Sequence, residues 1–253
     1  MKYLIANWKM KLAPRDEFAL AKEIAQMTFS STKLSLILAP SFLSMERISL
    51  TLKNTPILLA SQNCFWENSG AYTGETSPAY LKSLGCSHVI IGHSERRIYL
   101  FETPENINKK VRSVIDEMLV PILCVGESME ERRSGAKDHI VRRQIETALE
   151  KVELVGNQKL IIAYEPVWAI GTGHAAKVSE VLYMLRVIHQ ALIDTFPRAV
   201  CEENTAILYG GSVDSENINE FCEENEIQGA LIGSSSIKAK EFNKILTAMQ
   251  LYA

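Results

Sequence analysis

Long hydrophobic runs are missing from this sequence, and no segment approaches the length of a membrane span. A signal-peptide pattern is also missing, because Asn7, Trp8 and Lys9 interrupt the apolar stretch at the start. The five cysteines are odd in number, widely spaced and without a C-x-x-C pair, which argues against a disulfide framework or a zinc site. We therefore expect a soluble, cytoplasmic protein that has no membrane as a partner.

The sequence also lacks an excess of either charge, since 27 lysines and arginines stand against 30 aspartates and glutamates. This balance does not indicate nucleic acid as a partner, and an anionic substrate would have to be attracted by local groups. No Pro/Ser-rich linker, low-complexity tract or close repeat divides the chain. With 47% hydrophobic residues in 253 positions, we expect a substantial core and a single domain over residues 1–253.

Short, almost continuously apolar runs alternate with helical patterns along the whole chain. The expected strands are residues 3–8, 34–39, 57–61, 88–91, 121–125, 160–164, 206–209 and 229–232. The expected helices include residues 16–27, 106–118, 130–152 and 179–196, the last with Ser179 as its cap. An open, doubly wound sheet would have less hydrophobic edge strands, and no such gradient is present. The pattern predicts an α/β fold, a single (β/α)8 barrel of eight parallel strands with surrounding helices.

Reactive side chains follow several of the expected strands, at the edge where barrel enzymes place their chemistry. Asn7 and Lys9 end the first strand, although a strand-end lysine taken alone is usually a solvated charge. His93 follows the fourth strand. A lone histidine is more often structural, but Ser94 and Glu95 after it indicate the start of a helix. Because backbone N–H groups at such a start disfavour an imidazolium, we expect His93 to be neutral.

Glu165 ends the sixth strand, where an unpaired carboxylate costs free energy. On its own it fits a salt bridge as well as an acid–base role. The next residues, 166–173, form an apolar segment bounded by proline and glycines that contains Val167, Trp168 and Ile170. Such a loop indicates a lid that closes over a ligand.

The last two strands end in small residues, with Gly210, Gly211 and Ser212 after the seventh and Gly233 and Ser234 after the eighth. In barrels a phosphate often binds after these two strands, through exposed backbone N–H groups. Glycine-rich turns alone are a weak signal. Their location after the last two strands is what favours an anion site here.

Three other sequence patterns do not indicate a nucleotide-binding or metal site. Residues 171–176 match G-x-G-x-x-A, but the turn before them is too long, and Asp194, near the expected acidic position, falls inside a helix. No Walker phosphate loop is present. His139 and His189 lie in amphipathic helices and His88 starts a strand, so no ligand cluster has metal spacing. The sequence therefore predicts neither a nucleotide cofactor nor a metal.

Five segments together point to one family. They read ANWKM at 6–10, QNCFWENSGAYTGE at 62–75, IGHSERR at 91–97, AYEPVWAIGTG at 163–173 and YGGSV at 209–213. In this order and spacing they resemble the signatures of triosephosphate isomerase, over essentially the whole chain. The resemblance implies an enzyme that interconverts dihydroxyacetone phosphate and D-glyceraldehyde 3-phosphate through an enediolate, in glycolysis and gluconeogenesis, without a cofactor.

The resemblance also implies roles for single residues. Glu165 would move a proton between neighbouring carbons, and neutral His93 would donate to the substrate oxygens. Asn7 and Lys9 would add a hydrogen-bond donor and a fixed positive charge. Backbone N–H groups would hold the phosphate near four residues: Gly171, Ser212, Gly233 and Ser234.

Loop closure and dimerisation are implied in the same way. Three residues would form the lid and a clamp on Glu165: Trp168, Ile170 and Leu231. Closure of this lid would expel water from the site. Residues 64–75 resemble the loop that forms a homodimer, in which Thr73, next to Gly74, would approach the partner's active site.

The sequence departs from the usual pattern of the family in a few places. Phe101 stands where glycine is usual, and the last phosphate turn reads Gly-Ser-Ser-Ser from Gly233 where Gly-Gly-Ala-Ser is common. A left-handed backbone at Ser234 would cost about 1 kcal/mol, because its Cβ would crowd a carbonyl. An ordinary backbone there would carry no such cost, and the sequence leaves both possibilities open.

Two rival interpretations are weaker. A Schiff-base aldolase needs a lysine at the end of a late strand. Strands five to eight end instead in Cys124, Glu165, Tyr209 and Gly233. A catalytically inactive barrel kept for binding is disfavoured by the intact Lys9, His93 and Glu165.

Overall fold

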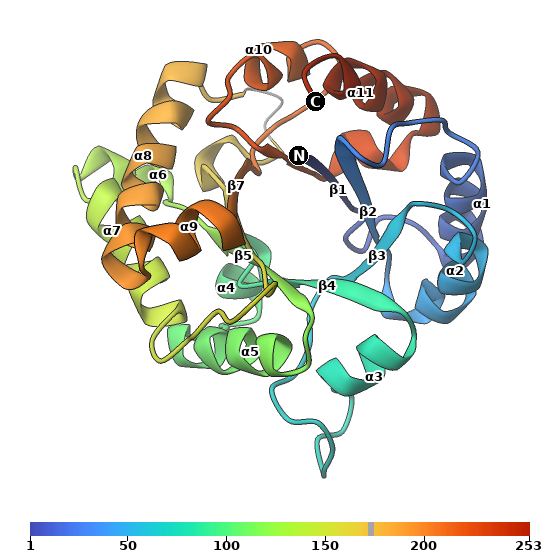
Figure 1. Cartoon of the computed structure of the whole chain (residues 1–253), viewed down its shortest axis with the longest axis horizontal. Helices are drawn as coiled ribbons and strands as arrows, with labels where there is room; N and C mark the ends of the chain where they lie inside the picture. The colour runs from blue at the N-terminus through green and yellow to red at the C-terminus, as the bar shows by residue number, and fades with distance from the viewer. Residues whose placement is uncertain (172–174) are drawn as a thin grey trace.

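Eight parallel strands close into a barrel in the computed structural model, which describes residues 1–171 and 175–253 (Figure 1). Each strand pairs with the next one in the chain, and β1 pairs with β8 to close the sheet. The strands are β1 (Lys2–Asn7), β2 (Leu34–Ala39), β3 (Leu58–Ser61), β4 (Cys86–Ile91), β5 (Val120–Val125), β6 (Leu160–Tyr164), β7 (Thr205–Tyr209) and β8 (Gly229–Ile232). The predicted (β/α)8 fold is confirmed.

Helices surround the strands as an outer ring (Figure 1). They include α1 (Pro14–Ile24), α2 (Met45–Leu52), α3 (Pro78–Ser83), α4 (Ser94–Tyr99), α5 (Pro104–Asp116), α6 (Met129–Arg133), α7 (Lys137–Ala148), α8 (Val178–Thr195), α9 (Arg198–Asn204), α10 (Ile218–Cys222) and α11 (Ala239–Leu251). Short 3-10 turns are η1 (Phe42–Ser44), η2 (Val167–Ala169) and η3 (Ser234–Ile237). None of the described helices is both long and apolar enough to cross a membrane.

The strands are apolar on both faces because each face is covered. Side chains such as Ile5, Ile37, Ile122 and Leu208 fill the inside of the barrel as one buried cluster. A second, larger cluster packs between the strands and the helices, with Trp8 fully buried in it. Burial of the apolar surface of these side chains, inside the barrel and between strands and helices, is the main stabilising contribution to the fold. The filled interior leaves only the ends of the strands for reactive groups.

The parallel arrangement places all carboxyl ends of the strands at one end of the barrel. Strands β1 and β2, for example, pair from Lys2 with Leu34 to Asn7 with Ala39. The loops that follow the strands therefore gather at the same end, including those that carry Lys9, His93 and Glu165.

Several element boundaries differ from the sequence prediction, most of them by one to three residues. The helix expected over 130–152 is two helices, since Gly135 has a left-handed φ of 78° between α6 and α7. Strand β4 begins at Cys86, two residues before His88. Helix α8 begins at Val178 after Lys177, which makes no side-chain cap, so the expected capping role of Ser179 is wrong.

One loop extends away from the barrel. Residues 62–77, between β3 and α3, protrude beyond the ring of helices (Figure 1). Inside this loop the Phe65 ring stacks on Trp66 at 3.9 Å between centroids and lies 4.6 Å from the Tyr72 ring. These aromatic side chains thus pack on one another, while Tyr72 is still 44% exposed.

Candidate active site

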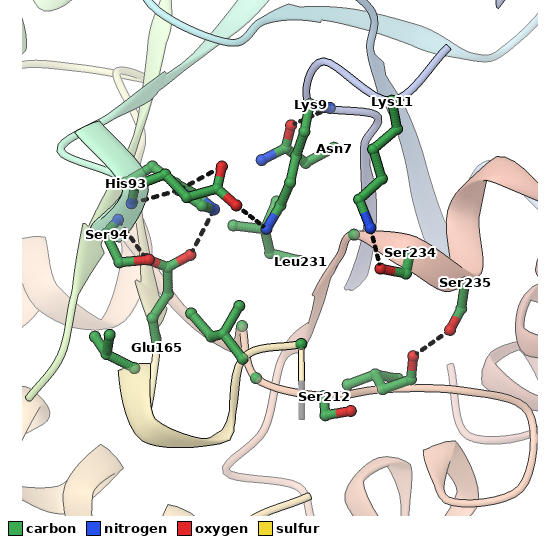
Figure 2. Close-up of a pocket in the computed structure, with 18 of the residues that line it drawn as sticks. Asn7, Lys9, Lys11, His93, Ser94, Glu165, Ser212, Leu231, Ser234 and Ser235 are labelled. Carbon is green, nitrogen blue, oxygen red and sulfur yellow. Dashed lines mark hydrogen bonds and ion pairs between the residues drawn. The ribbon is translucent and has the colours of Figure 1, made fainter. Parts of the chain in front are cut away.

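A cavity of about 470 Å³ opens at the carboxyl ends of the strands. Ten of the residues predicted for the site line it: Asn7, Lys9, His93, Glu165, Ile170, Gly171, Ser212, Leu231, Gly233 and Ser234. They come from loops far apart in the sequence. In Figure 2 Glu165 and His93 lie at one end of the cavity, Ser212 and Ser234 at the other, and Lys9 between them.

The Glu165 carboxylate is held at the end of β6 by two donors. Its Oε1 lies 3.0 Å from His93 Nε2, and its Oε2 accepts the backbone N–H of Ser94 at 3.0 Å. Only 2% of the residue is exposed. A Cβ at Gly210 would lie 3.1 Å from Glu165 Cγ, so glycine at this position leaves room for the side chain.

The tautomer of His93 follows from its place at the start of α4. The backbone N–H of Glu95 donates to His93 Nδ1 at 3.2 Å, so this nitrogen carries a lone pair. The ring proton of a neutral imidazole is then on Nε2, which faces Glu165. The start of this helix thus makes Nδ1 a hydrogen-bond acceptor and leaves Nε2 as the nitrogen that faces Glu165.

Lys9 is fixed in both its backbone and its side chain. Its φ of 54° is left-handed, and its N–H donates to Asn7 Oδ1 at 3.1 Å. Its carbonyl accepts from Gln62 Nε2 at 2.9 Å. The Lys9 ammonium forms an ion pair with Glu95 Oε1 at 2.7 Å. A Cβ at Gly233 would lie 3.2 Å from Lys9 Cε, so the lysine stem runs along the turn after β8.

Trp168 does not line the cavity and instead anchors the turn η2 to the loop after β5. Its Nε1 donates to Glu127 Oε1 at 2.9 Å, and Tyr164 Oη lies 3.1 Å from Glu127 Oε2. The Arg132 guanidinium stacks over the indole at 4.6 Å. Burial raises the pKa of Glu127, although the Trp168 and Tyr164 donors oppose this shift. Thr172 and Gly173, which the sequence analysis placed in the same loop, lie outside the described residues, as does His174.

Sequence reasoning missed Glu127 and Lys11. Glu127 lies two residues after the end of the apolar strand β5, a signal similar to the one that identified Glu165 directly after β6. Lys11 lines the cavity, and its ammonium donates to Ser234 Oγ at 2.5 Å. Lys11 lies two residues after Lys9, and nothing in the sequence distinguished it from an exposed, solvated lysine.

The backbone at Ser234 settles one question that the sequence left open. Ser234 is not among the described residues with a positive φ, whereas Phe101, another departure, is left-handed at 52°. The strain considered for Ser234 is therefore absent, and a cost of about 1 kcal/mol falls instead on Phe101. Beside this turn, Ser235 Oγ donates to the Val213 carbonyl at 2.7 Å and ties the loops after β7 and β8 together.

Thr73 and Gly74 lie in the protruding loop and do not line this cavity. Among the described residues, no group of three or more His, Cys, Asp or Glu side chains is placed to hold a metal ion. All five cysteines are free and buried. The described groups of the cavity are thus carboxylates, an imidazole, ammonium groups, hydroxyls and backbone amides.

A closed parallel barrel with these groups at its carboxyl end defines the chain as an acid–base enzyme of the (β/α)8 class. The family model described as triosephosphate isomerase matches residues 2–249. Curated proteins named triosephosphate isomerase are similar over almost the whole chain. The protein of Dictyoglomus thermophilum is 44% identical over 248 residues, which cover 97% of this chain and 98% of the relative. That of Dictyoglomus turgidum is 42% identical over 241 residues, 95% and 96% of the two chains. The chain therefore belongs to the triosephosphate isomerase family.

Proposed function

We propose that Glu165 is the base and His93 the electrophile of the isomerisation that this family catalyses. As a triosephosphate isomerase, the chain interconverts dihydroxyacetone phosphate and D-glyceraldehyde 3-phosphate, a reaction of glycolysis. The observation that carries the assignment is the contact between the buried Glu165 carboxylate and His93 Nε2, at 3.0 Å. It joins a proton acceptor to a proton donor at the carboxyl ends of two strands.

The reaction requires a proton to leave one carbon and arrive at its neighbour. Glu165 exchanges its present contacts for the C–H next to the substrate carbonyl and takes that proton. The electron pair of the C–H bond moves to the carbonyl oxygen and forms an enediolate. His93 Nε2–H donates to this oxygen, and the Lys9 ammonium and Asn7 amide stabilise the negative charge. Glu165 then returns the proton to the other carbon, while the hydroxyl proton passes between the two oxygens.

The opposite end of the cavity holds the phosphate in this proposal. Backbone N–H groups near Gly171, Ser212, Gly233 and Ser234 approach it, since all four residues line the cavity, and Ser212 and Ser234 lie at this end in Figure 2. The lid segment that contains Trp168 and Ile170 closes over the substrate and expels water, and Leu231 supports the base from the barrel side. Water exclusion strengthens each electrostatic contact within the site.

Turnover of glyceraldehyde 3-phosphate by the purified chain, with and without a chelator, tests the proposal. We expect full activity without any added metal or nucleotide. Complete loss of activity in the chelator, restored by a divalent cation, would contradict the cofactor-free mechanism. Unchanged kcat in a Glu165 variant would instead contradict the choice of base.

A homodimer is also proposed, from apolar side chains exposed in the loops after β1 to β4. Besides the protruding loop with Thr73 and Gly74, these are Met10 (96% exposed), Leu43 (85%) and Phe101 (82%). Their strands are neighbours in the sheet, so the side chains belong to one sector of the molecule. A fully active species of 28.3 kDa in light scattering would contradict the dimer.

We further propose one domain over residues 1–253 and a cytoplasmic location.

A further inference from the structure

The turn after β1 brings a second lysine to the rim of the active-site cavity. The Lys11 backbone N–H donates to the Trp8 carbonyl at 3.3 Å, which forms the turn. Because β1 pairs with β8, this turn lies beside the loop that follows β8. The Lys11 ammonium donates to Ser234 Oγ at 2.5 Å, at the end of the cavity away from Glu165 (Figure 2).

The carboxylates that line the cavity are engaged by other groups. Glu95 forms an ion pair with Lys9 at 2.7 Å, and Glu165 is held by His93 and Ser94. Asp214 Oδ1 accepts two backbone N–H groups of its own turn at 2.9 and 3.1 Å. In the part of the chain that the structure describes, Lys11 forms no ion pair, and its hydrogen-bond partner is a neutral hydroxyl. Its charge is therefore uncompensated.

We propose that Lys11, set in place by the Ser234 hydroxyl, is a second cation of the cavity and recognises the phosphate dianion of the triose substrate. This inference rests on the proposed function, which places the reacting carbons beside Glu165. The ammonium has three N–H donors, of which Ser234 uses one. The Ser234 oxygen accepts from Lys11, so its own O–H remains free to donate to an anion. Both groups then form charge-assisted hydrogen bonds to the phosphate.

A contact to the phosphate acts on a part of the substrate that does not react. It stabilises the bound substrate and the transition state alike, so its loss raises KM and leaves kcat almost unchanged. Because Lys11 is exposed, the attraction is screened by solvent, and we expect an effect of about threefold to tenfold. The effect requires the phosphate and disappears for a substrate without one.

The test compares Lys11→Met with a matched control, Lys33→Met, in the full chain. Lys33 is exposed and directly precedes β2, at the opposite end of the barrel, so the control removes the same charge far from the cavity. We expect Lys11→Met to raise the KM for glyceraldehyde 3-phosphate and the inhibition constant of inorganic phosphate by about threefold to tenfold. Its kcat/KM for unphosphorylated glyceraldehyde should equal that of the control. Lys11→Arg keeps the charge and should restore most of the affinity.

The role of Ser234 is tested by a double-mutant cycle. If the hydroxyl positions Lys11, Ser234→Ala should weaken phosphate inhibition by about twofold to fivefold and should have a smaller effect when Lys11 is already methionine. Additive effects of the two changes would overturn this positioning role.

Suppose that the wild-type chain turns over glyceraldehyde 3-phosphate, but that Lys11→Met and Lys33→Met have equal inhibition constants for inorganic phosphate. That result would overturn the role of Lys11 and leave the proposed function standing. A wild-type chain without turnover would overturn the proposed function itself. Thermal unfolding of each variant shows whether it is folded. If Lys11→Met is unfolded, Lys11→Gln replaces it with the same expected results.

Discussion

Replacement of Glu165 by glutamine tests the base directly, since the two side chains have almost the same shape. The carboxylate now accepts from His93 Nε2–H and from the Ser94 N–H, each at 3.0 Å. A glutamine has one acceptor oxygen for these two donors and no basic oxygen for a C–H proton. Loss of a positioned acid–base group lowers kcat by about 10²-fold to 10⁴-fold. We expect Glu165→Gln to lower kcat by at least about 10²-fold.

Glu165→Asp separates the position of the base from its chemistry. The aspartate keeps the carboxylate but withdraws it by one carbon–carbon bond, about 1.5 Å. A misplacement of about 1 Å costs roughly 10²-fold in rate, so Glu165→Asp should lie near that loss. Both variants should bind inorganic phosphate within about threefold of wild type, because the proposed phosphate groups lie at the other end of the cavity.

The assay is the steady-state turnover of glyceraldehyde 3-phosphate, with kcat and KM determined separately. Glu150→Gln serves as the control, since Glu150 is exposed and lies outside the cavity. A Glu165→Gln variant that retains a tenth of the wild-type kcat would refute the reasoning, because another group would then be the base. A large rise in the phosphate inhibition constant would also refute it, by showing that Glu165 shapes the anion site.

Three further predictions concern groups around the base. Cys124 is fully buried with its thiol pKa raised well above the ordinary value by burial, so Cys124→Ser should keep kcat within about threefold of wild type. Gly126→Ala should destabilise the fold by about 3 kcal/mol or more in urea unfolding, because its Cβ would lie 1.7 Å from the Glu165 carbonyl oxygen. Gly156→Ala, with open space around its Cβ, should cost only about 1 kcal/mol, and equal losses would contradict the steric reason. Burial raises the pKa of Glu127 above 4.5, so the folded state binds this proton more tightly than the unfolded state. The contribution of Glu127 to the free energy of unfolding is complete below pH 4.5 and is lost as the pH rises through the raised pKa. The free energy of unfolding of Glu127→Gln, measured in urea across that pH range, should not show this decline.

The sequence by itself determined the barrel and the residues at its catalytic end. Continuous apolar strands must be covered on both faces, and their alternation with helices leaves a closed parallel sheet as the consistent solution. Once the strands are parallel, their carboxyl ends coincide. Residues such as Lys9, His93 and Glu165, which lie one or two residues after the ends of their strands, then meet in one place without further information.

Only the tertiary structure decided how the surrounding groups pair. Trp168 and Glu127 are 41 residues apart, and Lys11 and Ser234 are 223 apart. No local pattern relates the members of either pair, because their contact depends on which loops neighbour each other and on how each side chain turns. The backbone at Ser234 and the break between α6 and α7 were equally beyond the sequence pattern, since φ at a single residue reflects the packing of the whole loop. Strand-end positions follow from periodicity, whereas contacts between loops follow from three-dimensional packing.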